Sequence, residues 1–158
     1  MKIKKTNAMR HLDTLKLPYE HFDLNLKEAA DANTVADLLH AKKEQVFKTL
    51  VTESNDKEHF VFMIPADKHL SLKKAAKAAG KKKIEMIAQK QLLPLTGYVH
   101  GGCSPLGMKK QFPTFFDQSA LEFETIYFSG GKIGVQIEMD PKLLEQAVGA
   151  KPFDLCED

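Results

Sequence analysis

The sequence has only two cysteines and no long apolar run, and each absence excludes a class of protein. Cys103 and Cys156 lie far apart and form no CxxC pair, so neither a disulfide framework nor a zinc site is indicated. No stretch approaches the roughly 18 apolar residues that a membrane-spanning helix needs. Residues 1–12 also lack the apolar core of a secretory signal. We therefore expect a cytoplasmic protein without a membrane segment.

Motifs that mark common nucleotide and hydrolase sites are missing as well. The chain contains no P-loop, no GxGxxG and no GxSxG. Its 6 histidines are scattered without the HxxxH spacing of a metal site. We therefore predict neither a metal nor a cofactor.

What is present is the composition of an ordinary globular protein. The chain has 158 residues, of which 43% are hydrophobic and 28% charged. This length suffices for one sizeable hydrophobic core and is short for two, because domains typically hold roughly 100 to 200 residues. We predict a single domain over residues 1–158.

Charge is distributed unevenly along the chain. Residues 1–110 contain 20 Lys or Arg against 12 Asp or Glu, whereas residues 111–158 contain 3 against 9. Between Lys68 and Lys83 there are seven lysines and no acid. This basic stretch has two interpretations, a solvated helix surface or a patch that contacts phosphates.

Hydrophobic periodicity and turn residues predict an irregular alternation of helices and strands. Helices are expected within 6–17, 31–41, 71–80, 88–97 and 140–150, and strands within 19–24, 45–54, 59–66, 82–87 and 124–139. Two hairpins are expected, one around the polar turn of residues 54–58 and one around Gly130 and Gly131. The residues expected to face inward in the second and third helices are Val35, Leu38, Leu39, Leu72, Ala75, Ala76 and Ala79. Hairpins mixed with crossovers favour an α/β (α+β) protein with a mixed sheet flanked by helices.

Residues 101–110, GGCSPLGMKK, form an unusual loop. Its glycines and proline leave little side-chain cover, so backbone amides can converge on an anion or a carbonyl oxygen. The alternative is that Cys103 is a nucleophile, which requires a nearby base and a lowered thiol pKa. His100 is near in sequence, but neighbouring side chains on an extended segment tend to point apart, so a Cys–His pair is the less favoured interpretation.

Lys48 lies inside the apolar segment QVFKTLV, at the start of a predicted strand. Its ammonium group must either extend past the apolar side chains to water or enter a cavity. The sequence around Lys48 leaves both interpretations open.

Four segments resemble, in their order and spacing, the YbaK/EbsC family of free-standing aminoacyl-tRNA deacylases, which is related to the editing insertion domain of prolyl-tRNA synthetase. They are VFKTLV, GYVHGGCSPLGMKK, PTFFD and FSGGKIGVQIEM, and the resemblance runs from about Thr6 to Ala150. It implies a mixed, mostly antiparallel sheet or partly open barrel flanked by helices.

The same resemblance implies the site residues. The catalytic groups would be Lys48, Gly101, Gly102 and Ser104. Substrate contacts would come from the rest of the loop and from polar pocket positions, namely Tyr19, Thr49, Cys103, Pro105, Ser129 and Gln136. Gln136 falls where some members of the family have an acidic residue. The basic stretch would contact tRNA through Lys73, Lys74, Lys77, Lys81, Lys82 and Lys83.

The substrate implied by the resemblance is mischarged tRNA, chiefly the Cys-tRNA(Pro) that prolyl-tRNA synthetase makes in error, with Cys-tRNA(Cys) and other small aminoacyl-tRNAs as alternatives. The synthetase would be a transient partner. In the family the substrate's own thiol attacks its carbonyl and releases a cyclic thiolactone, so Cys103 would be a bystander. Two rival hypotheses are a non-catalytic RNA-binding or regulatory module and a hydrolase of small esters that depends on Cys103.

Overall fold

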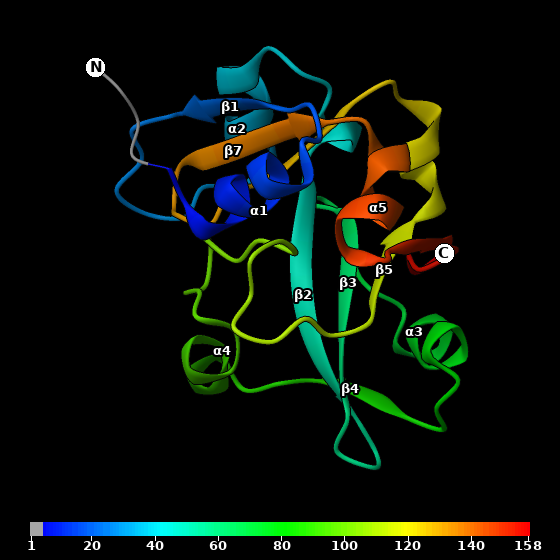
Figure 1. Cartoon of the computed structure of the whole chain (residues 1–158). Helices are drawn as coiled ribbons and strands as arrows, with labels where there is room; N and C mark the ends of the chain where they lie inside the picture. The colour runs from blue at the N-terminus through cyan, green and yellow to red at the C-terminus, as the bar shows by residue number, and fades with distance from the viewer. Residues whose placement is uncertain (1–4) are drawn as a thin grey trace.

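The computed structural model describes residues 5–158 and consists of two sheets with helices around them (Figure 1). The smaller sheet has the order β1 (Glu20–Asp23), β7 (Val135–Met139), β6 (Ile126–Ser129). The larger sheet has the order β4 (Ile84–Met86), β2 (Phe47–Ser54), β3 (His59–Pro65), β5 (Thr114–Asp117), β8 (Lys151–Phe153). The α-helices are α1 (Asn7–Leu15), α2 (Ala32–Leu39), α3 (Leu72–Ala79), α4 (Gln89–Thr96) and α5 (Leu144–Val148). Short 3-10 helices span Lys43–Gln45, Gln118–Glu122 and Pro141–Leu143.

Neither sheet closes into a barrel, and most strand pairs are antiparallel. The smaller sheet is entirely antiparallel, and the larger one is parallel only where β5 pairs with β3 and β8. The predicted mixed α/β architecture is confirmed, as are both predicted hairpins, β2–β3 and β6–β7. Two strands were not predicted from the sequence, β5 and β8. β5 has only four residues, and the three residues of β8 are exposed and include Pro152, which an edge strand tolerates.

Capping residues mark three of the helix ends. The hydroxyl of Thr6 accepts a hydrogen bond from the N–H of Met9 at 3.2 Å and begins α1, and the hydroxyl of Ser71 accepts one from the N–H of Lys74 at 3.2 Å and begins α3. Gly80 ends α3 with φ of 70°. The two hydroxyls accept hydrogen bonds from N–H groups that have no partner within the helix, and Gly80 adopts the left-handed conformation in which the chain leaves the helix.

Two leucines that we expected to face inward are exposed, so the prediction was wrong at these positions. Leu38 of α2 is 46% exposed and Leu72 of α3 is 42% exposed. An eight-residue helix on a sheet buries only a narrow stripe of its surface. In these helices small side chains occupy that stripe, Ala36 in α2 and Ala75 and Ala76 in α3.

The larger sheet separates two apolar layers, because alternate residues of a strand face opposite sides. On one side, α3 and Leu155 pack against Phe62. On the other side, α4 and the loop that follows it pack against Val51. The smaller sheet and α1 cover Phe47 and Met63 on this second side. The helix α3 therefore lies across the larger sheet from the loop of residues 100–103.

β2 has an open edge along its first half. Val46 forms a bridge with Tyr127 of β6, while β4 pairs with β2 only at residues 52–54. Residues 47–50 therefore have a neighbouring strand on one side alone, which is β3. The gap left by β4 and β6 is where the candidate site forms.

Candidate active site

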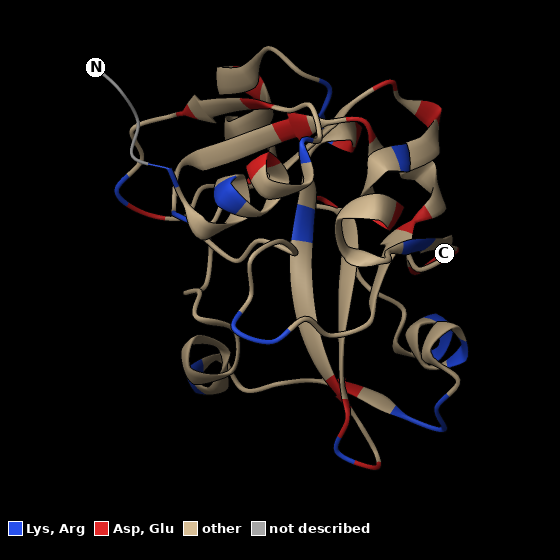
Figure 2. Cartoon of the chain, in the orientation of Figure 1, with Lys and Arg blue, Asp and Glu red and all other residues tan. Residues whose placement is uncertain are grey.

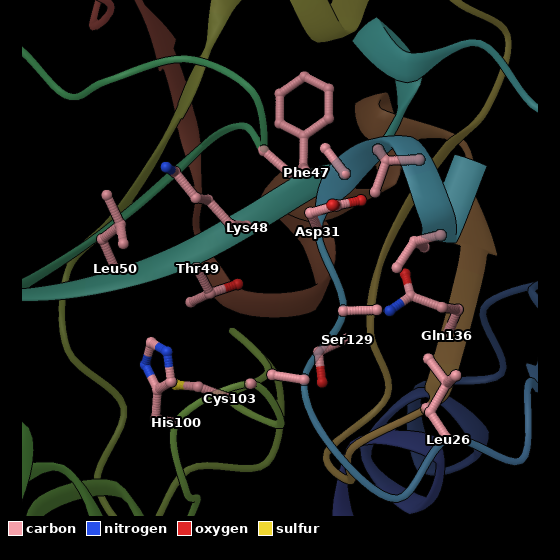
Figure 3. A pocket seen from close by; sticks show the side chains of 18 of the residues that line it. Leu26, Asp31, Phe47, Lys48, Thr49, Leu50, His100, Cys103, Ser129 and Gln136 are labelled. Carbon is pink, nitrogen blue, oxygen red and sulfur yellow. The ribbon is translucent and has the colours of Figure 1, made fainter. Parts of the chain in front are cut away.

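A cavity of about 310 Å³ lies at the open edge of β2 (Figure 3). Most of its lining comes from four separate segments, within residues 26–35, 46–50, 100–103 and 129–136. Consecutive residues of β2 reach it, although their side chains leave opposite faces of the strand, because the cavity is at the strand's edge. The site residues predicted from the sequence that line this cavity are Lys48, Thr49, Gly101, Cys103, Ser129 and Gln136.

Thr49 presents both backbone and side-chain polar groups to this cavity. The N–H of Ser54 donates to the C=O of Glu58 at 2.8 Å, and alternation along the antiparallel register then directs the N–H and C=O of Thr49 away from β3, toward the open edge. Oγ1 of Thr49 and Oε1 of Gln136 are buried without a hydrogen-bond partner among residues 5–158. Because buried polar atoms are normally paired, these unpaired atoms indicate a binding site for a polar ligand.

Lys48 leaves β2 on the side opposite to Thr49, together with Leu50 (Figure 3). Its side chain is partly buried and forms no ion pair with any carboxylate of residues 5–158. Burial lowers the pKa of the Lys48 ammonium, and the charge of Asp67 acts in the opposite direction. Lys48 also lines a second hollow on the α3 side of the sheet, beside Leu72. An unpaired, partly desolvated cation at a cavity wall can interact strongly with a phosphate or a developing oxyanion.

Close packing holds the loop of residues 100–103 against the cavity. Gly101 has φ of 85°, and a Cβ at this position would lie 2.6 Å from Cβ of Ala29. A Cβ on Gly102 would lie 3.0 Å from the backbone nitrogen of Ile133. Gly101 therefore requires glycine for its φ and for space, and at Gly102 an added Cβ would press on the backbone of Lys132 and Ile133.

The amides of this loop are not equivalent. The N–H of Gly102 donates to the C=O of Val99 at 3.0 Å, so it is committed within the loop. No backbone carbonyl among residues 5–158 accepts from the N–H of Gly101 or Cys103. These two amides are therefore not committed to another backbone group and are available to a ligand in the cavity.

Cys103 is a buried thiol. Its side chain belongs to the apolar layer with Val51, and burial raises the pKa of the Cys103 thiol to about 12. Figure 3 places His100 on the same side of the cavity, but no hydrogen bond joins the His100 ring to the Cys103 sulfur. The conditions for a cysteine nucleophile, a low thiol pKa and a bonded base, are therefore not met.

Four residues proposed from the family resemblance do not line the cavity: Tyr19, Gly102, Ser104 and Pro105. The hydroxyl of Tyr19 donates to Oδ1 of Asp13 at 2.9 Å. Burial, and to a lesser extent this hydrogen bond, raises the pKa of Tyr19 to about 12. Oγ of Ser104 accepts from the N–H of Leu106 at 3.3 Å. Ser104 and Pro105 follow residues 100–103 directly in the chain, and both are buried.

Ion pairs neutralise half of the lysines proposed to contact tRNA. Lys74 pairs with Asp154 at 3.1 Å and Asp158 at 3.0 Å. Lys81 pairs with Asp56 at 2.8 Å and Glu58 at 3.2 Å, and Lys83 pairs with Glu85 at 2.9 Å. The remaining three are exposed and have no carboxylate of residues 5–158 within ion-pair distance: Lys73, Lys77 and Lys82. All six lie on α3 or between α3 and β4, and Figure 2 shows blue on both segments.

Asp31 lines the cavity and was not identified from the sequence. It is the residue before α2, and its Oδ1 accepts a hydrogen bond from the N–H of Thr34 at 2.8 Å. This hydrogen bond lowers the pKa of Asp31. Capping alone accounts for an aspartate here, so no signal in the sequence distinguishes it from other caps.

Residues 5–158 provide neither a membrane-spanning helix nor a metal-binding cluster. Every helix there is too short or too polar to cross a membrane. Those residues also contain no group of three or more His, Cys, Asp and Glu side chains arranged to hold a metal ion.

Residues 27–156 match the aminoacyl-tRNA editing domain, and this range contains every cavity residue except Leu26. The chain belongs to the aminoacyl-tRNA editing domain family. An Enterococcus faecalis protein named “Putative Cys-tRNA(Pro)/Cys-tRNA(Cys) deacylase EbsC” is 46% identical over 142 residues, which are 89% of this chain and 87% of that protein. The family predicted from the four sequence segments is therefore confirmed.

Two solved structures share the fold of this editing domain. One is described as “a putative trans-editing enzyme for prolyl tRNA synthetase”; it is 24% identical, covers 96% of both chains and has a TM-score of 0.86. The other, a hypothetical protein, is also 24% identical with a TM-score of 0.86, and the match covers 96% of this chain and 100% of that one. The predicted editing-domain fold is confirmed by these similarities.

Proposed function

We propose that this editing-domain protein is a trans-editing deacylase that removes cysteine from Cys-tRNA(Pro), and also from Cys-tRNA(Cys). The name of the 46% identical relative supports this substrate. The observation that carries the proposal is the cavity at the open edge of β2, which offers unpaired polar groups and a cation, while burial raises the pKa of the Cys103 thiol in its lining. Such a cavity suits a substrate that supplies the attacking atom.

The need for such an enzyme follows from the small difference between cysteine and proline. A site that selects by size gains only about 1–3 kcal/mol from one methylene group, so a synthetase for proline also activates cysteine at times. Removal of the wrong amino acid by a second protein corrects the error. We propose prolyl-tRNA synthetase as a transient partner for this reason.

In the proposed reaction the substrate's thiol sulfur attacks the ester carbonyl carbon. The new C–S bond closes a cyclic thiolactone, the C–O bond to the terminal ribose breaks, and the thiol proton ends on the ribose oxygen. The protein holds the ester so that the sulfur lies against the carbonyl carbon. This lowers the activation free energy, because the entropy of orienting the two groups is lost on binding rather than in the reaction step. The N–H groups of Gly101 and Cys103 donate toward the carbonyl oxygen, and Lys48 interacts with negative charge on the phosphate or the oxyanion.

A deacylation panel tests this proposal. Purified protein is incubated with Cys-, Ala-, Ser- and Pro-tRNA, and the loss of each ester is followed together with the product. Cys-tRNA should be the best substrate, with thiolactone appearing before free cysteine. Binding of tRNA without loss of any ester would favour the RNA-binding module instead, and free cysteine as the first product would favour a hydrolase.

Replacing Cys103 by alanine should leave deacylation of Cys-tRNA within about threefold of the parent. The reaction takes its sulfur from the substrate, and the raised pKa keeps Cys103 a neutral thiol. The measurement is the initial rate of ester loss, with Cys156→Ala as a matched thiol control. A hundredfold loss in Cys103→Ala with an unchanged melting temperature would support the hydrolase that depends on Cys103.

The three unpaired lysines of the basic stretch should contribute to tRNA affinity through phosphates. Reversing Lys73, Lys77 and Lys82 to Glu should flatten the log–log salt dependence of tRNA binding by about 2 to 3, from ~0.7 per phosphate on single strands or ~0.9 on duplex. Because α3 lies across the sheet from the loop of residues 100–103, these contacts would involve nucleotides some distance from the ester held by that loop.

Charge reversal at Lys16 and Lys142, outside the basic stretch, is the control for lost positive charge elsewhere on the surface; it changes the net charge by about −4, against about −6 in the triple variant. Lys74 is left intact in both variants, because it holds the carboxylates of Asp154 and Asp158. A salt slope that does not change in the triple variant would assign the stretch to solvated helix surface.

A further inference from the structure

The charges around the cavity are arranged with opposite signs on its two sides. Figure 3 places Lys48 and His100 on one side of Thr49, and Asp31 and Gln136 on the other. Within the described range, residues 5–158, Asp31 is the only carboxylate in the lining and Lys48 is its only lysine. A ligand that carries both a cation and an anion therefore has one favoured orientation in this cavity.

The exposed carboxylate of Asp31 is held at the start of α2 and has no cationic partner among residues 5–158. Its Oδ1 accepts from the N–H of Thr34 at 2.8 Å, and the side chain of Thr34 also helps to lower the pKa of this carboxyl group. The N-terminus of α2 carries a partial positive charge of about +0.5, which does not cancel the full negative charge of the carboxylate. The mouth of the cavity is therefore negative at this point.

Gln136 supplies a second acceptor from a rigid position. It lies on β7, the central strand of the smaller sheet, where it pairs with Phe22 of β1 and Ser129 of β6. Its Oε1 is buried and has no hydrogen-bond partner among residues 5–158. A buried acceptor without a donor is costly, so the native ligand is expected to provide an N–H or O–H here.

We propose that Asp31 and Gln136 form a subsite for the α-ammonium group of the esterified amino acid. This inference rests on the proposed function. An aminoacyl ester has one cationic group, and Asp31 supplies the opposite charge while Gln136 Oε1 accepts one of its N–H bonds. Lys48 on the far side repels the ammonium group and attracts the phosphate end, so the ester enters in a single orientation.

The subsite gives the enzyme a selectivity that side-chain size cannot give. An ester whose amino group is acylated has no positive charge and one N–H in place of three. The protein should therefore act on free aminoacyl-tRNA and reject N-acylated esters, the chemical class to which peptidyl-tRNA belongs. This would protect growing chains from premature release.

The test compares substrates that differ only at the amino group, Cys-tRNA(Pro) and N-acetyl-Cys-tRNA(Pro). The parent should prefer the free amine in kcat/KM by at least about tenfold, the scale of one charge-assisted hydrogen bond. Asp31→Asn should reduce that preference to within about threefold, by slowing the free-amine substrate. Asparagine caps a helix as well as aspartate does, so α2 should stay folded.

Asp37→Asn is the matched control, because Asp37 is an exposed acid on the same helix that does not line the cavity. It should keep the parent's preference. A preference that is unchanged in Asp31→Asn, or absent in the parent, overturns the subsite while leaving deacylation itself standing. Gln136→Leu should also lower the preference, since the acceptor is lost.

A binding measurement separates failure of the subsite from failure of the proposed function. The probe is adenosine with cysteine linked to its 3′ position through an amide, together with the N-acetylated form, and dissociation constants are measured by calorimetry. The parent should bind the free-amine probe at least about tenfold more tightly, and Asp31→Asn should not. Equal binding of both probes by the parent would overturn the subsite, even if the protein deacylated none of the tRNAs.

Discussion

Replacing Lys48 by alanine should lower deacylation of Cys-tRNA(Pro) by about 10²-fold or more, the scale of losing one preorganised group that stabilises transition-state charge. Lys48 lines the cavity, is partly buried and has no carboxylate partner among the described residues, so its charge is free to act on the substrate. The fold should survive, because no ion pair is broken. Initial rates of ester loss and circular dichroism melts are the measurements.

Two variants make the Lys48 result specific. Lys48→Arg keeps the charge but places a broader guanidinium at the cavity wall, so it should recover only part of the activity. Lys43→Ala removes a nearby lysine that pairs with Asp67 at 3.7 Å and does not line the cavity, and it should leave turnover nearly unchanged. If Lys48→Ala turned over Cys-tRNA(Pro) within about threefold of the parent and melted normally, the ammonium would have no part in the reaction.

Gly101→Ala is the second variant with a large expected effect. It should lower deacylation by about ten- to a hundredfold, because a shift of roughly 1 Å in a positioning group can cost 10²-fold. An alanine Cβ there would meet Cβ of Ala29 at 2.6 Å, so the loop must move away from its place beside β2. The left-handed φ of 85° should cost a further ~1–2 kcal/mol of stability.

Two controls separate space from backbone strain in this prediction. Gly80→Ala has the same kind of φ, 70°, but nothing lies within 4 Å of the added Cβ, so stability should fall and activity should not. Adding Ala29→Gly to Gly101→Ala removes the contact and should restore most of the activity without removing the strain. Full activity in Gly101→Ala alone would mean that the position of this loop does not limit the reaction.

Helices and hairpins were largely predictable because their signals act over a few neighbouring residues. Thr6 and Ser71 cap their helices through amides three residues ahead, and Gly80 supplies the left-handed residue that ends α3. The β2–β3 hairpin follows from two apolar runs around a polar turn. Leu38 and Leu72 were wrongly predicted to face inward, because the buried stripe of a short helix depends on what the helix packs against.

The site was predictable in part, and only through the resemblance of whole segments to a family. Lys48, Thr49, Ser129 and Gln136 do line one cavity, although nothing local distinguishes them from other polar residues on strands. Tyr19 does not line it, and its hydroxyl is bonded to Asp13. Asp31 was missed, since its side chain has a sufficient local role as a helix cap.

The sequence by itself determined the order of the elements, the family and the presence of a glycine-rich loop, because these depend on residue type and spacing along the chain. The tertiary structure alone decided which groups meet. β4 stops pairing at Thr52 and β6 meets β2 only at Val46, so an edge is left open to which both Lys48 and Thr49 contribute. Burial decided that the thiol of Cys103 stays neutral, since a thiol pKa depends on its surroundings. Folding likewise brought distant carboxylates onto Lys74 and Lys81, so the charge that the sequence concentrates there is partly neutralised by contacts between residues far apart in the chain.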